Sequence, residues 1–199
     1  PRPTPTPVPT LAPTPAAAAP QVQVPLAAGA VFPLYYDQQA QWYLQQKGAT
    51  TISAYNLGIP ARIRSAVDTS ALEAALAYML DRHALLRASF NFADGRLTQK
   101  INADCKPDFQ VIDAAGWDDD RLRDEVIRAD RRAFDLAVGP PIRARLFRCA
   151  EGDHVLLITV HHIVFDGWTG SLLMHELGEA YAALARGQTP QLPPLRASY

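Results

Sequence analysis

Two adjacent histidines, His161 and His162, are the residues of this sequence best suited to chemistry. They open the segment HHIVFDG, which ends in Asp166 and Gly167. A neutral imidazole has an ordinary pKa of about 6.5 and can take up a proton near neutral pH, which suits a general base. Asp166 could cap a following helix or hold an arginine, and Gly167 lets the backbone turn sharply. The segment therefore indicates acid-base chemistry or close approach to a ligand.

Other interpretations of the histidine pair are open. Both rings could be core residues that bond to backbone carbonyls. A metal site would need three or four ligands, but His83, His154 and His175 are scattered, with no HxH or HExxH spacing. A Ser-His-Asp triad would need a nucleophile, and the chain has no GxSxG segment. Because neighbouring residues of a strand face opposite sides, only one of the two histidines can face a given cavity.

The elements that must position the histidines alternate between helix and strand. Residues 155–160 are nearly all apolar, as in a strand buried on both faces, and they lead directly into the pair. The helix expected after Gly167 carries apolar residues at helical spacing, namely Leu173, Leu177, Tyr181 and Leu184. Such interleaving predicts a layered α/β sandwich with a mostly buried mixed sheet covered by helices.

Two helices are expected near the start of the fold. Residues 38–46 suit a short helix with Ala40, Tyr43 and Leu44 on one side. Residues 70–83 show stronger helical spacing of apolar residues. In the first turn of this expected helix, Ser70 and Glu73 have the spacing of a capping box.

Further elements follow in the middle of the chain. Residues 86–101 predict a β-hairpin with its turn at 94–95. A charged helix is expected over 119–133, and a strand over 142–149.

Residues 1–30 differ in composition from the rest. They hold nine of the seventeen prolines, and Arg2 is their only charged residue. Such a stretch cannot bury a core, so we expect an extended, semi-stiff linker before a globular domain of residues 31–199. A Pro-rich recognition peptide is the alternative.

The composition excludes several classes of function. The net charge is −1 at pH 7, which gives no field to attract nucleic acid or an anionic membrane. Cys105 and Cys149 form neither a disulfide framework nor a zinc motif. No segment has the length of an apolar membrane span, and the first residues lack the pattern of a signal peptide. A cytoplasmic location is expected.

The segment 161–167, followed by Trp168, resembles the HHxxxDG motif of condensation domains from non-ribosomal peptide synthetases. These domains are similar in fold to chloramphenicol acetyltransferase, which implies a two-layer α/β sandwich. Residues 33–46 are similar to the opening motif of the family, although Tyr35 stands where Ser or Thr is more common.

Two more segments agree with this family in the same order along the chain. Residues 81–90 resemble its RHExLRTxF motif, with Ala84 in place of the usual Glu. Residues 134–143 resemble its FDLxxGPLxR stretch. The resemblance covers residues 32–199.

The resemblance implies an acyltransferase that joins an acceptor amine to a donor acyl thioester. Both substrates would be held on phosphopantetheine arms of partner carrier (thiolation) domains, the donor upstream and the acceptor downstream. This chain would bind no covalent cofactor. His162 would be catalytic, as a base or by orienting the amine, and His161 would point into the lobe.

Four further residues receive roles from the same resemblance. Asp166 would pair with Arg87 to fix the loop; the alternative for Arg87 is an exposed strand position. Gly167 and the amide of Trp168 would lie where an oxyanion could be stabilised.

The resemblance also implies that residues 31–199 are the N-terminal lobe of a two-lobe domain, without its C-terminal lobe, and that the active site lies in a tunnel between the lobes. The isolated lobe would be inactive and would expose Phe165 and Trp168. The alternatives are a CoA-dependent acyltransferase of the same fold and a non-catalytic lobe for carrier docking or scaffolding.

Overall fold

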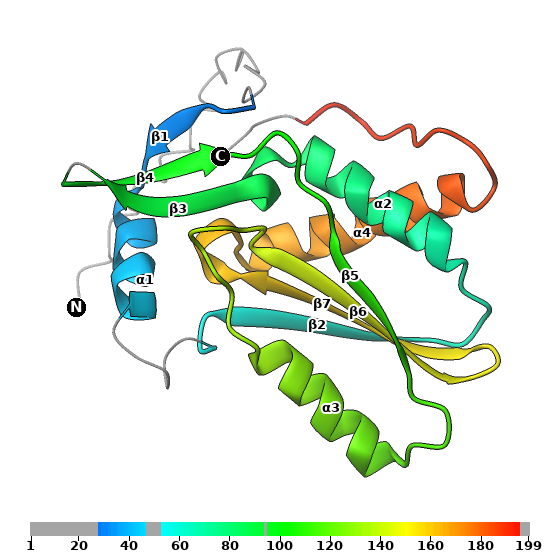
Figure 1. Cartoon of the computed structure of the whole chain (residues 1–199). Coiled ribbons are helices and arrows are strands. Elements are labelled where there is room, and N and C mark those ends of the chain that lie inside the picture. Colours follow the sequence, from blue (N-terminus) through cyan, green and yellow to red (C-terminus); the bar gives the residue numbers. More distant parts are fainter. Residues whose placement is uncertain (1–27, 47–52, 94, 196–199) are drawn as a thin grey trace, which may run out of the picture.

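A computed structural model of the chain describes residues 28–46, 53–93 and 95–195. Within these residues the strands form two sheets, a three-stranded sheet of order β1-β4-β3 and a four-stranded sheet of order β2-β7-β6-β5 (Figure 1). The strands are β1 (Val31–Pro33), β2 (Asn56–Ile63), β3 (Ala88–Ala93), β4 (Arg96–Ile101), β5 (Asp108–Asp113), β6 (Ile142–Ala150) and β7 (Asp153–His161). The helices are α1 (Tyr36–Gln46), α2 (Thr69–Arg82), α3 (Asp119–Arg131) and α4 (Gly167–Leu184), with short 3-10 helices η1 (Ala84–Arg87) and η2 (His162–Val164).

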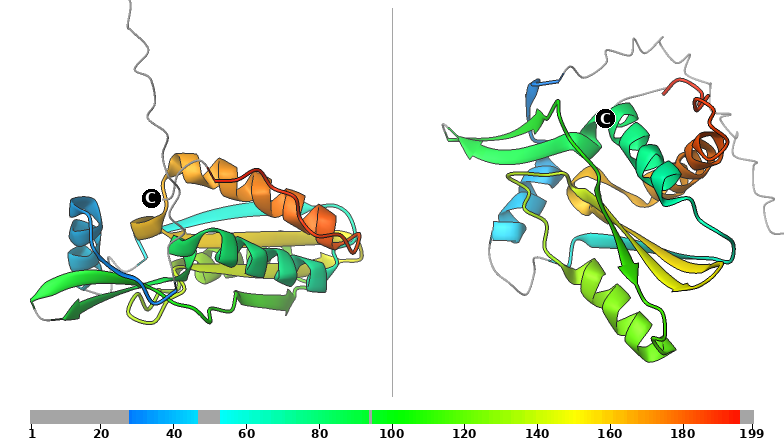
Figure 2. Two further views of the ribbon diagram at one scale, coloured as in Figure 1. Left: turned by 90° about the horizontal axis from the view of Figure 1, so that it is seen from above. Right: turned by 45° about the vertical axis from the view of Figure 1, so that its right-hand side comes forward.

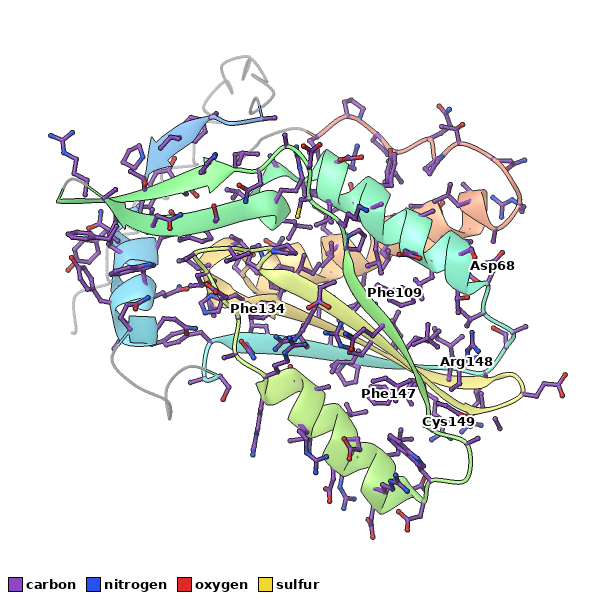
Figure 3. The ribbon with its side chains drawn as sticks, in the orientation of Figure 1. Asp68, Phe109, Phe134, Phe147, Arg148 and Cys149 are labelled. Carbon is purple, nitrogen blue, oxygen red and sulfur yellow. The ribbon has the colours of Figure 1, made fainter. Side chains whose placement is uncertain are left out.

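Helices cover both faces of the four-stranded sheet. The helices α2 and α4 lie side by side on one face, and α3 lies on the other (Figures 1 and 2). Successive side chains of a strand point to opposite faces of the sheet, so both faces of β7 can be covered. Leu156 and Ile158 pack in the core below α2 and α4, whereas Leu157 packs in the core of α3. Phe109 and Phe147 lie on these opposite faces (Figure 3). The expected α/β sandwich with a mixed, largely buried sheet is confirmed.

The three-stranded sheet was not anticipated as a separate unit. The predicted hairpin forms β3 and β4, which pair antiparallel, and β1 adds to the outer edge of β4. The helix α1 lies beside this sheet and the η2 turn (Figure 1). Their shared core contains Leu34, Phe90, Phe134 and Ile163. The histidine segment therefore lies where the two sheets and α1 meet.

The edge strand β5 was missed by the sequence analysis. It pairs with β6 in parallel, and α3 makes the connection between the two strands. Val111 and Gln110 of β5 are exposed, so the strand lacks a continuous apolar run. Its pairing depends on β6, which is distant in sequence, rather than on a strong local signal.

The start of α2 differs from expectation. The N-cap of α2 is Asp68, whose carboxylate accepts hydrogen bonds from the backbone nitrogens of Ser70 (2.9 Å) and Ala71 (3.0 Å), so the predicted capping box is wrong. The expected short helix forms as α1, and its residues Ala40, Tyr43 and Leu44 are exposed.

Most of the predicted linker lies outside the described residues. At its end, the amide of Gly29 donates to the carbonyl of Ile101 (2.7 Å), and the amide of Ile101 donates to Ala30 (3.0 Å). In the part of the chain that the structure describes, no helix has both the length and the apolar composition to cross a bilayer.

Candidate active site

The two histidines lie on either side of the end of β7. His161 is the last residue of the strand and is fully buried, whereas His162 begins the η2 turn and is exposed. The sequence analysis predicted opposite orientations, and the structure has them. Its reason was incomplete, however, because His162 has already left the strand. The backbone is fixed on both sides here, since His161 N donates to Pro141 O (2.9 Å) and His162 N donates to Tyr55 O (2.8 Å).

The ring of His161 is satisfied inside the protein. Its Nδ1 accepts from the amide of Ile163 (3.1 Å), so the proton of the neutral ring lies on Nε2, which is 3.5 Å from Gln45 Oε1. Phe134 packs edge-on against the ring, with centroids 6.0 Å apart. Burial lowers the pKa of His161 to about 4, and the charges of His162 and Arg143 add to this. His161 is therefore a neutral packing residue at physiological pH.

A buried arginine lies next to this histidine. Arg143 donates to the last carbonyls of the α3 segment, at Asp130 (3.1 Å), Arg132 and Ala133 (3.3 Å). Its guanidinium lies 4.0 Å from the ring centroid of Phe134, which is labelled in Figure 3. Burial lowers the pKa of Arg143 to about 10, with smaller effects from neighbouring arginines. It therefore remains charged near neutral pH and caps the end of α3.

The side chain of His162 faces solvent at the edge of α1. Its Nδ1 lies 3.4 Å from Nε2 of Gln41 on α1. No other hydrogen bond of this ring is found among the described residues, so Nε2 is available to a ligand. An exposed imidazole held at one nitrogen can donate or accept a proton at the other.

Asp166 and Gly167 form the start of α4. Asp166 is the N-cap, and its Oδ1 accepts from the backbone nitrogen (2.9 Å) and the hydroxyl (2.6 Å) of Thr169. Gly167 is the first helical residue. The helix-capping interpretation of Asp166 is thus correct, and it fixes where α4 begins relative to His162.

Arg87 was predicted to pair with Asp166, and the hydrogen bonds of its guanidinium go to other groups. Among the described residues, the Arg87 guanidinium bonds to carbonyls instead, at Leu80 (2.9 Å), Asn102 (2.9 Å) and Ala103 (3.5 Å). The Leu80 carbonyl lies in the last turn of α2, and the other two carbonyls follow β4, so Arg87 joins these two elements.

Two aromatic residues were expected on an exposed face. Phe165 is instead buried, with 6% of its surface exposed, and it packs in the core below α4. The side chain of Trp168 lies outside the described part of the chain. Exposed aromatic residues occur instead at α1 and the hairpin, where Tyr43 and Phe92 both contact the ring of Trp42.

Sequence reasoning missed Glu176 on α4, which is buried. Arg82 donates to both of its carboxylate oxygens (3.0 and 2.8 Å), and His83 Nε2 lies 2.6 Å from Oε2. Arg82 also donates to the carbonyl of Pro193 (2.5 Å). Burial would raise the pKa of Glu176, but the hydrogen bonds from Arg82 and His83 outweigh it and lower the pKa. The burial of Glu176 and its pairing with Arg82 and His83 depend on residues more than 90 positions away in sequence, so no local pattern indicates them.

The glutamines of α1 were not predicted as part of the site either. Gln41 contacts His162, and Gln45 contacts His161. Their spacing of four residues places them on one helix face, but polar residues are usually assigned to solvent. Within residues 28–46, 53–93 and 95–195, no three His, Cys, Asp or Glu side chains gather as a metal site requires.

The chain is similar in sequence to known proteins of one family. A family model described as the condensation domain matches residues 30–199. The isonitrile lipopeptide synthase of Mycobacterium tuberculosis is 37% identical over 180 residues, which are 88% of this chain and 7% of that protein. The dimodular nonribosomal peptide synthase of Bacillus subtilis is 37% identical over 169 residues, 84% of this chain and again 7% of that protein. The chain thus spans a small part of these relatives.

Solved structures share the fold. The starter condensation domain of rhizomide synthetase RzmA superposes with a TM-score of 0.75 at 24% identity, over 82% of this chain and 40% of that one. A variant of that domain was solved in complex with C8-CoA. The X-domain from teicoplanin biosynthesis has a TM-score of 0.74 at 29% identity, over 83% of this chain and 35% of that one.

Proposed function

This chain belongs to the condensation-domain family, and we propose that it supplies the histidine-bearing half of an amide-forming acyltransferase site. The observation that carries the proposal is the position of His162, an exposed imidazole at the end of a buried strand, fixed by Gln41 and Tyr55. The domain of residues 31–199 is the N-terminal lobe, and a second lobe provides the opposite wall.

The proposed substrates are a donor acyl or peptidyl thioester and an acceptor aminoacyl thioester on the phosphopantetheine arms of two carrier domains. The acceptor nitrogen attacks the thioester carbonyl carbon, the C–N bond forms, and the C–S bond breaks. The nitrogen loses a proton, and the donor arm leaves as a thiol. His162 either accepts that proton or donates a hydrogen bond to the reacting groups.

Other residues of the site position His162. The fully buried His161 holds the strand end, while Asp166 and Gly167 define the start of α4. Arg87 ties α2 to the end of β4 and so contributes to the shape of the lobe. The amides of Gly167 and Trp168 remain candidates for stabilising an oxyanion, because they begin a helix next to His162.

A CoA-dependent acyltransferase is the second candidate function. It gains support from the structural relative that was solved with C8-CoA. The two candidates differ only in the carrier of the donor acyl group.

The test uses the longer protein that contains this domain, supplied with a loaded acceptor carrier and either a carrier-bound or a CoA-bound donor acyl group. We expect amide product, detected by mass spectrometry, from the carrier-bound donor and none from the 199-residue chain alone. Product from acyl-CoA alone would favour the second candidate. Carrier binding without product from either donor would indicate a docking lobe.

A further inference from the structure

Three glutamines of α1, Gln38, Gln41 and Gln45, lie at positions i, i+3 and i+7, on one face of the helix. We call them the glutamine stripe. Each contacts a different residue at the end of β7 and the η2 turn. Gln38 is fully engaged, because its Nε2 donates to Ile163 O (3.1 Å) and its Oε1 accepts from Tyr35 N (3.1 Å). This contact anchors the stripe to the turn that carries the exposed histidine.

Gln45 fixes the proton of the buried histidine. The amide of Ile163 occupies Nδ1 of His161, so the ring offers Nε2–H to Gln45 Oε1. The amide nitrogen of Gln45 in turn donates to Phe134 O (3.3 Å). Each polar atom of this pair thus has a defined role as donor or acceptor.

Gln41 contacts the exposed His162 as a hydrogen-bond donor, whereas Gln45 contacts the buried His161 as an acceptor. Its Nε2, which can only donate, lies 3.4 Å from Nδ1 of His162, while its Oε1 is buried and has no hydrogen-bond partner among the described residues. Turning the amide over would bury an N–H at that place instead, and orphaned buried N–H groups are rarer than under-satisfied carbonyls. Nδ1 of His162 is therefore the acceptor, and the proton of the neutral ring lies on Nε2.

We infer that Gln41 is a positioning residue that holds His162 as the tautomer protonated at Nε2, so that His162 donates a hydrogen bond instead of removing a proton. This inference rests on the proposed function. During attack of the amine, negative charge develops on the thioester oxygen, and the outward N–H is suited to stabilise it. The proton lost from nitrogen then leaves with the departing thiolate.

The tautomer can be read without any substrate. Two-bond ¹H–¹⁵N spectra of the ¹⁵N-histidine-labelled chain, at a pH where His162 is neutral, should show protonated Nε2 and unprotonated Nδ1. Gln41→Leu should abolish the preference. Gln41→Glu, an acceptor of the same length, should reverse it. Gln46→Leu, an exposed position of the same helix, is the matched control and should change nothing.

Either of two results would overturn the inference: a proton on Nδ1 in the unchanged chain, or an unaltered His162 spectrum in both Gln41 variants. Thermal unfolding followed by circular dichroism checks that each variant is folded. The Glu variant keeps the side-chain shape, so it gives the same answer if the Leu variant does not fold.

Activity then separates the donor from the base. In the longer protein, at a pH above the NMR titration midpoint of His162 in each variant, Gln41→Glu should lower kcat by about 100-fold, comparable to losing one oxyanion donor. The KM for the carriers should stay constant, as should the kcat of Gln46→Leu. Unchanged or faster turnover in Gln41→Glu would contradict the donor role. If His162→Ala keeps full turnover, the proposed function fails, while the tautomer result stands independently.

Discussion

His161 and His162 are adjacent but have opposite exposure, and burial decides which of them can meet a substrate. The sequence analysis predicted this division but could not predict its partners, Gln45 and Gln41. A helix face of polar residues is ordinarily solvated. Here it packs against imidazoles and backbone groups, which need hydrogen bonds rather than apolar contact.

The buried histidine should make stability depend on pH. Because the pKa of His161 is about 4 in the folded chain and about 6.5 when unfolded, the unfolded state binds more protons between these values. The contribution of neutral His161 to the free energy of unfolding is fully present above pH 6.5. It falls by about 3 kcal/mol towards pH 4. Urea unfolding gives the free energy of unfolding of the wild type and of His161→Asn. The difference between the two proteins should be smaller at pH 4 than at pH 7 by about 3 kcal/mol. A pH-independent difference would refute it.

At the scale of elements, α2 and α4 are joined by a buried ion cluster as well as by their apolar core. Glu176→Gln removes the charge that Arg82 and His83 face, leaving an arginine with 12% side-chain exposure unpaired. We expect a loss of about 3 kcal/mol in the free energy of unfolding. Glu179→Gln, exposed on the same helix, should change it by less than about 0.5 kcal/mol. Equal effects in urea unfolding would disprove the role of the cluster.

The contact between β2 and α3 depends on a glycine. A Cβ at Gly58 would lie 2.4 Å from Oδ1 of Asp130, which also accepts from Thr159 Oγ1 (3.2 Å). Gly58→Ala should therefore lower the unfolding free energy by about 1–3 kcal/mol. Gly178→Ala, where nothing lies within 4 Å of the added atom, should raise it by up to about 1 kcal/mol. A fall in melting temperature for Gly178→Ala, or none for Gly58→Ala, would contradict this.

Elements with strong local signals could be predicted from the sequence, and elements that depend on distant partners could not. The strand β7 and the helices α2, α3 and α4 have marked apolar or charge periodicity and were predicted. The edge strand β5 and the contacts of Arg87 depend on partners far away in sequence, which no local pattern encodes. Phe165 was placed on the surface from the family resemblance, whereas it packs in the core below α4.

At the scale of the whole molecule, the described chain is one wall of the proposed site. It covers 40% and 35% of the solved relatives, and His162 faces outward from its own core. Positioning two tethered substrates can contribute roughly 7–11 kcal/mol to lowering a barrier, but only when both are held in register. One wall cannot do this, which is why activity is expected only from the longer protein.

The role of His162 is tested most directly by the rate of amide formation by the longer protein with and without its imidazole. With both carriers loaded, single-turnover product formation should fall by about 100-fold or more in His162→Ala, while carrier binding is unchanged. His175→Ala, at an exposed position of α4, should match the wild type. Undiminished product formation by His162→Ala would contradict the central claim that this residue acts on the reacting groups.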